Sequence, residues 1–71
     1  MYYNYHAIIK KRIANGEIIS AKMLEKYNKI SPCLLLIFDD KVYPIREHMF
    51  AEYLDILRSH NVKIDNKLWK F

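Results

Sequence analysis

The residues best suited to chemistry are Arg46, Glu47 and His48, the densest polar group in the chain. An arginine can hold a carboxylate or phosphate through two parallel hydrogen bonds, and a histidine can transfer a proton near neutral pH. Adjacent residues of a helix point in different directions, however, so three in a row do not converge on one substrate. We therefore interpret Glu47 as an acidic residue of a first helical turn and keep Arg46 and His48 as candidate binding residues.

Three other groups could carry chemistry: His6 as a general base or ligand, Cys33 as a nucleophile, and Asp39-Asp40 as paired carboxylates. Each has a simpler interpretation. His6 can be a partly buried imidazole bonded to a backbone carbonyl, Cys33 an inert thiol in an apolar segment, and Asp39-Asp40 part of a turn. The histidines and the cysteine lack metal-ligand spacing, so we predict no metal and no cofactor. An enzyme built on Arg46, His48 and His6 would require these side chains to converge in one pocket.

Lys10, Lys11 and Arg12 begin an excess of positive charge in the first part of the chain. Residues 1–31 carry six Lys or Arg and two Asp or Glu, whereas residues 32–71 carry six of each. Such cations attract phosphates, and the tyrosines that precede them could stack on bases. No helix-turn-helix, RNP, KH or zinc-finger signature accompanies them. Nucleic-acid binding through Lys10, Lys11 and Arg12 is therefore the alternative hypothesis.

The length of 71 residues allows one small domain, residues 1–71, with a core that supplies only marginal stability. Disulfides, metals and partners are the usual additional stabilisers of such domains. A single cysteine excludes an intrachain disulfide, so self-association is the stabiliser that remains. We predict a cytoplasmic protein, because the thiol is free and no secretion signal is present. We predict no membrane partner, because the longest apolar run is only residues 33–38.

The first expected element is a helix between a capping Asn4 and the Asn15-Gly16 stop. Its apolar residues recur at helical spacing at Tyr5, Ile8, Ile9 and Ile13. A second helix is expected from Glu47 to about His60, with an inner stripe of Phe50, Tyr53, Leu54 and Leu57.

Between the helices, residues 33–38 form an apolar run typical of a strand buried on both faces. A turn at Asp39-Asp40-Lys41 and a short strand at residues 42–45 complete a hairpin, and Pro44 places that second strand at an edge. Residues 18–27 fit either a helix, by propensity, or a strand with Ile19, Ala21, Met23 and Tyr27 on one face. We favour the strand because a wholly apolar strand needs a partner on its other side.

These elements predict an α+β fold in the order helix, three-stranded antiparallel sheet, helix, with both helices on one sheet face and an ordered C-terminal tail. The predicted core is Ile9, Ile13, Leu34, Leu36, Phe38, Phe50, Leu54 and Leu57. Alternation along the central strand then turns Cys33, Leu35 and Ile37 to the other face, where they need cover.

Four short segments are distinctive in combination: Tyr5-His6-Ala7, Gly16-Glu17, Ile30-Ser31-Pro32 before the apolar strand, and Pro44-Ile45-Arg46 before the last helix. Together they resemble a family of small bacterial proteins of unknown function, some labelled thermostable-hemolysin-like. The resemblance covers residues 5 to about 57 and implies no established active site. Hemolysis itself does not fit a chain with no secretion signal, spanning segment or strongly amphipathic membrane helix.

The leading hypothesis is a non-enzymatic interaction module that acts as a homodimer. Large apolar residues in a charged tail are expected to dock on the domain or on a second copy. We therefore predict an interface made by the tail and the second sheet face: Leu35, Ile37, Leu68, Trp69 and Phe71.

Overall fold

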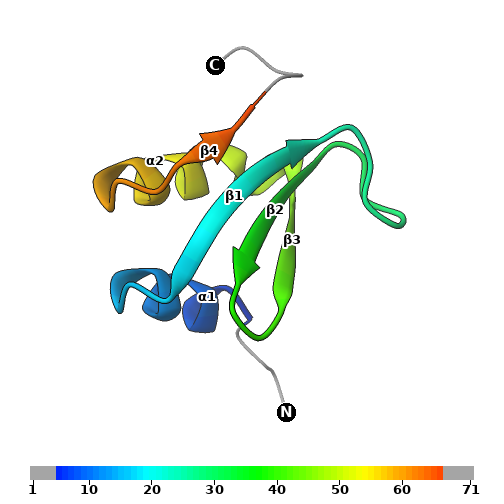
Figure 1. Cartoon of the computed structure of the whole chain (residues 1–71). Coiled ribbons are helices and arrows are strands. Elements are labelled where there is room, and N and C mark those ends of the chain that lie inside the picture. The colour runs from blue at the N-terminus through cyan, green and yellow to red at the C-terminus, as the bar shows by residue number, and fades with distance from the viewer. Residues whose placement is uncertain (1–4, 67–71) are drawn as a thin grey trace.

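A computed structural model of the chain describes residues 5–66 and shows two helices packed on one face of a four-stranded sheet (Figure 1). The helices are α1 (Tyr5–Ala14) and α2 (Phe50–Ser59), the latter preceded by a 3-10 turn, η1 (Glu47–Met49). The strands are β1 (Ile18–Leu24), β2 (Cys33–Phe38), β3 (Val42–Arg46) and β4 (Ile64–Asp65), in the sheet order β3-β2-β1-β4. The predicted α+β class and the order helix, strands, helix are confirmed.

The sheet differs from the prediction because a fourth strand, β4, makes it mixed rather than antiparallel. After α2 the chain returns along the free edge of β1, where Ile64 and Asp65 lie parallel to Ala21 and Lys22. The amide of Ala21 donates to the carbonyl of Lys63 at 3.2 Å. A two-residue strand has too few residues for a visible period-two pattern, so only the tertiary pairing reveals it. The predicted tail residues Leu68, Trp69 and Phe71 lie outside the described residues.

Residues 18–24 form a strand, which settles the choice between helix and strand in favour of the strand. β2 pairs antiparallel with β1 on one side and with β3 on the other, so the backbone of this apolar run has hydrogen-bonding partners along both of its edges. The strand ends at Leu24, earlier than predicted, and residues 25–32 form a loop. Within the loop Tyr27 and Ile30 exchange two backbone hydrogen bonds of 2.8 and 2.9 Å.

A β-bulge near the start of β1 changes the side on which Ile19 lies. The register shifts between Ile18 and Ser20, so Ile18 packs against the core whereas Ile19 is 62% exposed. Ala21 and Met23 are buried as the period-two pattern predicts, but the placement of Ile19 on their face was wrong. A bulge inserts one residue into the alternation, and every position before it then changes face.

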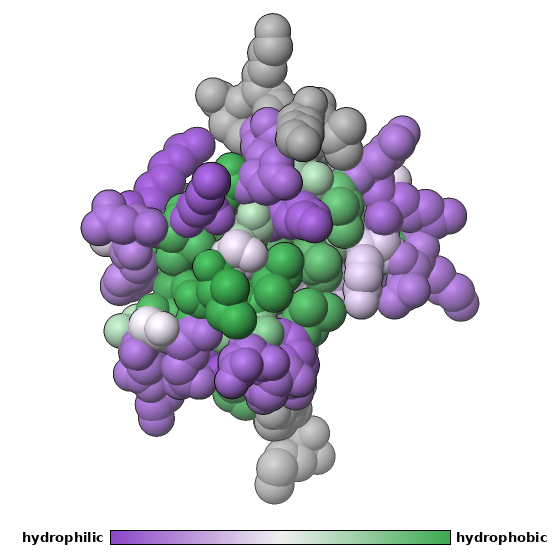
Figure 2. Space-filling view, viewed as in Figure 1, coloured by the Kyte–Doolittle hydropathy of each residue, from purple (hydrophilic) through white to green (hydrophobic). Residues whose placement is uncertain are grey.

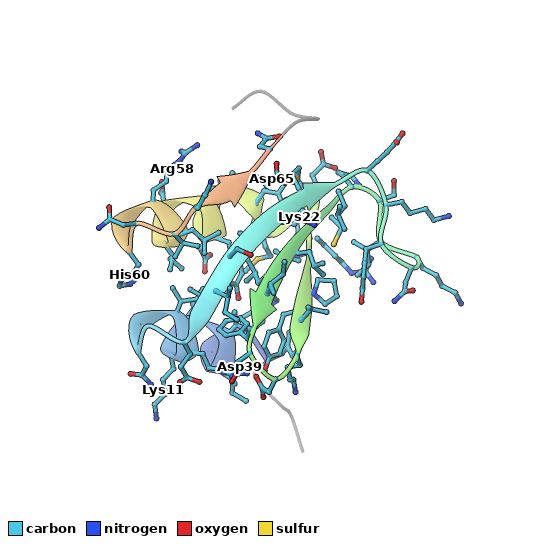
Figure 3. The ribbon with its side chains drawn as sticks, viewed as in Figure 1. Lys11, Lys22, Asp39, Arg58, His60 and Asp65 are labelled. Carbon is cyan, nitrogen blue, oxygen red and sulfur yellow. The ribbon has the colours of Figure 1, made fainter. Side chains whose placement is uncertain are left out.

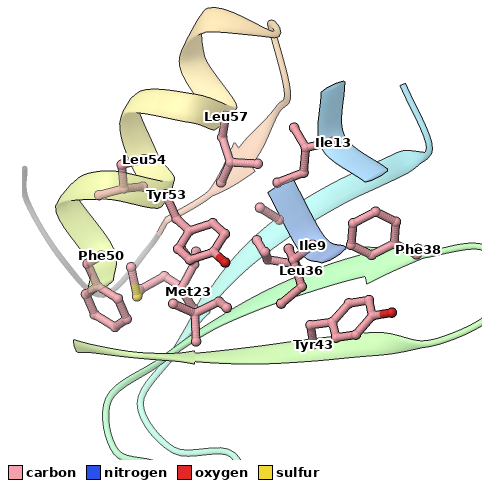
Figure 4. Packing of buried hydrophobic residues seen from close by; sticks show 13 residues of the cluster. Ile9, Ile13, Met23, Leu36, Phe38, Tyr43, Phe50, Tyr53, Leu54 and Leu57 are labelled. Atoms are coloured by element: carbon pink, nitrogen blue, oxygen red, sulfur yellow. The ribbon is translucent and has the colours of Figure 1, made fainter. Parts of the chain in front are cut away.

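The core lies between the sheet and the two helices (Figure 4). Each helix contributes a stripe at helical spacing, with Ile9 and Ile13 from α1 and Phe50, Tyr53, Leu54 and Leu57 from α2. All eight predicted core residues are buried, and Ala21, Met23, Tyr43, Ile45 and Tyr53 join them.

Both helices end in the same motif, in which a residue with positive φ closes the last turn. In α1 this residue is Gly16, with φ 75°, and the amides of Gly16 and Glu17 donate to the carbonyls of Ile13 and Arg12 at 3.0 Å. In α2 it is Asn61, with φ 57°, whose amide donates to the Arg58 carbonyl at 3.1 Å. These bonds satisfy carbonyls that a helix end otherwise leaves without partners.

We expect opposite changes in stability from Gly16→Ala and Asn61→Gly. A Cβ at Gly16 meets no atom within 4 Å, so its cost is the backbone strain of a left-handed alanine, about 1 kcal/mol off the free energy of unfolding. Glycine at position 61 relieves the corresponding strain and raises that free energy by about 0.5 kcal/mol. Urea unfolding followed by circular dichroism measures both, and destabilisation by Asn61→Gly would contradict this account.

Candidate functional site

The most distinctive surface of the molecule is the face of the sheet opposite the helices, here called the open face. The side chains that alternate with the buried ones form it: Ser20, Lys22 and Leu24 from β1, Cys33, Leu35 and Ile37 from β2, Val42, Pro44 and Arg46 from β3, and Asp65 from β4. Figure 2 looks onto this face and shows hydrophobic residues gathered at its centre, with hydrophilic residues around them. No described helix or strand lies over it.

The structure places the predicted interface residues Leu35 and Ile37 on the open face, but with unequal exposure. Leu35 is only 8% exposed and Cys33 is fully buried, so the prediction that Cys33, Leu35 and Ile37 all need cover was wrong for the first two. Leu35 lies in register between Lys22 and Pro44, whose side chains flank it within the sheet. Burial also raises the pKa of the Cys33 thiol, which keeps it unreactive.

The exposed apolar surface comes instead from the edges of the open face. Ile37 is partly exposed, Val42 beside it is 37% exposed, and Ile19 at the bulge is 62% exposed. Ile19 also borders an open cavity of about 390 Å³ between the C-terminal ends of the two helices and the start of β1. His60, Asn61 and Lys63 line the same cavity beside apolar residues, so its lining is mixed in character.

Three charged side chains accompany this apolar surface. Lys22 lies near its centre and is in register with Asp65 on β4, as Figure 3 shows. Arg46 ends β3 at the opposite edge of the sheet, in register with Cys33. All three are exposed, and none forms an ion pair with another residue of the described range 5–66. The open face therefore carries both signs of charge, and these charges have no ion-pair partner among residues 5–66.

The predicted basic patch is largely neutralised within the fold. Lys10 forms an ion pair with Glu52 of α2 and lies over the ring of Tyr53. Lys11 is exposed and has no ion pair among the residues that the structure describes. Three adjacent cations therefore do not present a joint surface to phosphates, and nucleic-acid binding stays a prediction with Lys11 as the available cation.

Arg12 joins α1 to two other parts of the chain. Its Nε donates to Glu17 at 2.9 Å, and its two terminal nitrogens donate to the Tyr43 hydroxyl at 3.0 Å and to Asp40 at 2.6 Å. The guanidinium also stacks over the ring of Phe38, 4.5 Å from its centroid. Arg12 is thus a structural tie between the end of α1 and the β2–β3 hairpin, a role that no local sequence pattern indicates.

His6 lies at the boundary between the two helices. A hydrogen bond of 2.8 Å joins its Nδ1 to the hydroxyl of Tyr53, so the predicted backbone-carbonyl partner was wrong. Burial raises the pKa of Tyr53 to about 12, which keeps the hydroxyl protonated at neutral pH. The pair connects α1 to α2.

The candidate binding residues Arg46 and His48 are both exposed, at the end of β3 and in η1. The contacts of His6 are to Tyr5 and Tyr53, and no contact in the described part of the chain brings it to Arg46 or His48. Residues 5–66 contain no group of three or more His, Cys, Asp or Glu that could hold a metal ion, and none of their helices is long and apolar enough to cross a membrane. The open face is therefore the candidate functional site.

A scan against protein-family models, a search of curated proteins and a search of solved structures each found no match to this chain. The family resemblance stated above stays a prediction.

The tie between Arg12 and Asp40 predicts a specific dependence of stability on pH. The hydrogen bond from Arg12 holds the pKa of Asp40 below its usual range, so this contribution is complete above the unfolded-state pKa, about 3.9, and is lost as pH falls through the folded pKa. We expect Arg12→Gln to be less stable than the native chain at pH 6, with the difference shrinking as pH is lowered towards the folded pKa. Thermal unfolding at a series of pH values measures this.

The neighbouring substitution Lys11→Gln is the matched control, because Lys11 lies on the same helix without an ion pair in the described range. Its pH profile should follow that of the native chain. A constant difference between Arg12→Gln and the native chain at every pH would show that Arg12 acts through packing on Phe38 and Tyr43 alone.

Proposed function

We propose that this protein is a small, non-enzymatic interaction module that associates with a second copy of itself through the open face. The observation that carries the proposal is a one-sided sheet whose uncovered face bears exposed apolar side chains from β1, β2 and β3. A sheet with one solvated face normally carries polar residues there. Ile19, Ile37 and Val42 are the departures from that pattern.

A second copy suits this surface because the open face is complementary to itself. It combines exposed apolar side chains with Arg46 of one sign and Asp65 of the other. Two sheets pack face to face about 10 Å apart, with strands nearly aligned, and their inner side chains form a shared core. Association would thus supply the second core layer that a chain of 71 residues cannot build for itself.

The dimensions of the sheet indicate a weak rather than an obligate dimer. Four strands about 4.8 Å apart, with about seven residues at 3.3 Å in the longest, span a flat footprint of roughly 400 Å². A stable interface buries about 800 Å² of accessible surface from each partner. We therefore expect a dissociation constant in the micromolar range for the dimer.

We also propose that the protein resides in a reducing compartment such as the cytoplasm, because its single cysteine is unpaired.

The first test compares Val42→Lys with Ile8→Lys. Val42 and Ile8 are each 37% exposed, but Val42 lies on the open face whereas Ile8 lies on the helical layer. Each substitution adds one positive charge and removes similar apolar area. Sedimentation equilibrium should show a dissociation constant at least about tenfold higher for Val42→Lys, because the new charge must be desolvated in the interface, and no change for Ile8→Lys. Equal effects of the two substitutions would exclude the open face as the interface.

The second test removes a charge that the association must desolvate. Lys22 lies near the centre of the open face, where its ammonium loses water when a second sheet covers it. We expect Lys22→Met to lower the dissociation constant about three- to tenfold in the same measurement. Lys11→Met, which removes a charge from the helical layer, should leave it unchanged. Tighter association of both variants would indicate a general effect of net charge.

A further inference from the structure

Two charged residues lie at opposite edges of the open face and near the same end of the sheet. Arg46 belongs to the edge strand β3 and is in register with Cys33, whereas Asp65 belongs to the edge strand β4 and is level with Leu35. Along the strand direction, the positions of Arg46 and Asp65 therefore differ by two residues. An arginine side chain is long enough to span that distance. Neither residue has an ion pair within the described part of the chain.

We propose that the two copies pack with their two-fold axis parallel to the strands, so that Arg46 of each copy binds Asp65 of the other. This inference rests on the proposed function and specifies the register of the same interface. A two-fold axis in this direction places β3 of one copy over β4 of its partner, and β2 over β1. It therefore brings the two opposite charges together twice, once at each side of the axis.

The apolar residues agree with this register. Ile37 on β2 is level with Ser20, next to the bulged Ile19 on β1. When β2 of one copy lies over β1 of its partner, Ile37 packs beside the partner's Ile19, the most exposed of the large apolar side chains in the described range. Lys22, which is in register with Leu35, then lies over the partner's Leu35 rather than over a second lysine.

The other way of stacking the two sheets brings like charges together. A two-fold axis perpendicular to the strands, through the middle of the sheet, places every strand over its own copy and reverses its direction. Lys22 then faces the partner's Lys22, and Asp65 faces the partner's Asp65. Juxtaposed like charges select strongly against a register, so the parallel axis is the favoured arrangement.

The experiment is a charge exchange between the two copies. Arg46→Glu and Asp65→Arg each create two like-charge contacts across the axis. Each should raise the dissociation constant at least about tenfold in sedimentation equilibrium at about 0.1 M salt. The double variant restores opposite charges at both contacts and should associate to within about threefold of the native chain.

Mixing the two single variants is the decisive measurement. A mixed dimer has two attractive contacts, so an equimolar mixture should associate where each variant alone does not. The control is Arg58→Glu, which reverses a charge on the helical layer, on the other side of the sheet from the open face (Arg58 is labelled in Figure 3). This substitution should not change association. A rescue between separate chains cannot come from a local effect on folding.

The outcomes separate this register from the proposed function. If the native chain dimerises but neither the mixture nor the double variant recovers association, the register is wrong and the interface stands. If the native chain stays monomeric at several hundred micromolar, the proposed function fails. If neither single variant weakens the dimer, Arg46 and Asp65 lie outside the contact and the register is likewise excluded.

Discussion

The central strand β2 imposes the constraint on which the rest of the structure depends. Its six residues, from Cys33 to Phe38, are all apolar, so its backbone needs partners on both edges and its side chains need cover on both faces. β1 and β3 supply the edges, which is why residues 18–24 form a strand although their sequence also suits a helix. The helices cover one face, and on the other face the flanking Lys22 and Pro44 of the neighbouring strands leave Leu35 only 8% exposed. The remaining exposure at the edges of that face is what a second molecule can remove.

Periodicity was sufficient to predict the elements whose pattern is strong and continuous. The helical spacing of Ile9 and Ile13, and of Phe50, Leu54 and Leu57, identified both helices and the faces that they bury. Three features required information that no local pattern contains. The bulge before Ser20 shifts the alternation by one residue, β4 consists of only two residues, and its parallel pairing with β1 depends on where α2 ends. The sheet was therefore predicted with its first three strands and without its fourth.

The candidate site shows the same division between local and long-range information. Composition marked Lys10, Lys11 and Arg12 as a basic surface, because a count of charges does not register partners that are distant in sequence. Glu52 and Asp40 reach two of these cations through the fold and convert them into ties between α1 and its neighbours. Alternation along β2, by contrast, placed Leu35 and Ile37 on the open face correctly. Their different exposure depends on flanking side chains of β1 and β3, which the pattern of β2 alone does not specify.

Lys22 would restrict the partners and registers that the exposed apolar face can accept. A wholly apolar sheet face would associate with many surfaces and in several registers, whereas a charge near its centre makes every covered arrangement cost desolvation free energy. Only an arrangement that adds favourable contacts elsewhere offsets that cost. Arg46 and Asp65, at opposite edges and without internal partners in the described chain, are placed to supply such contacts in one orientation. In the proposed dimer, weak affinity and a defined register would thus depend on the same few side chains: desolvation of Lys22 limits the affinity, and the pairs between Arg46 and Asp65 determine the register.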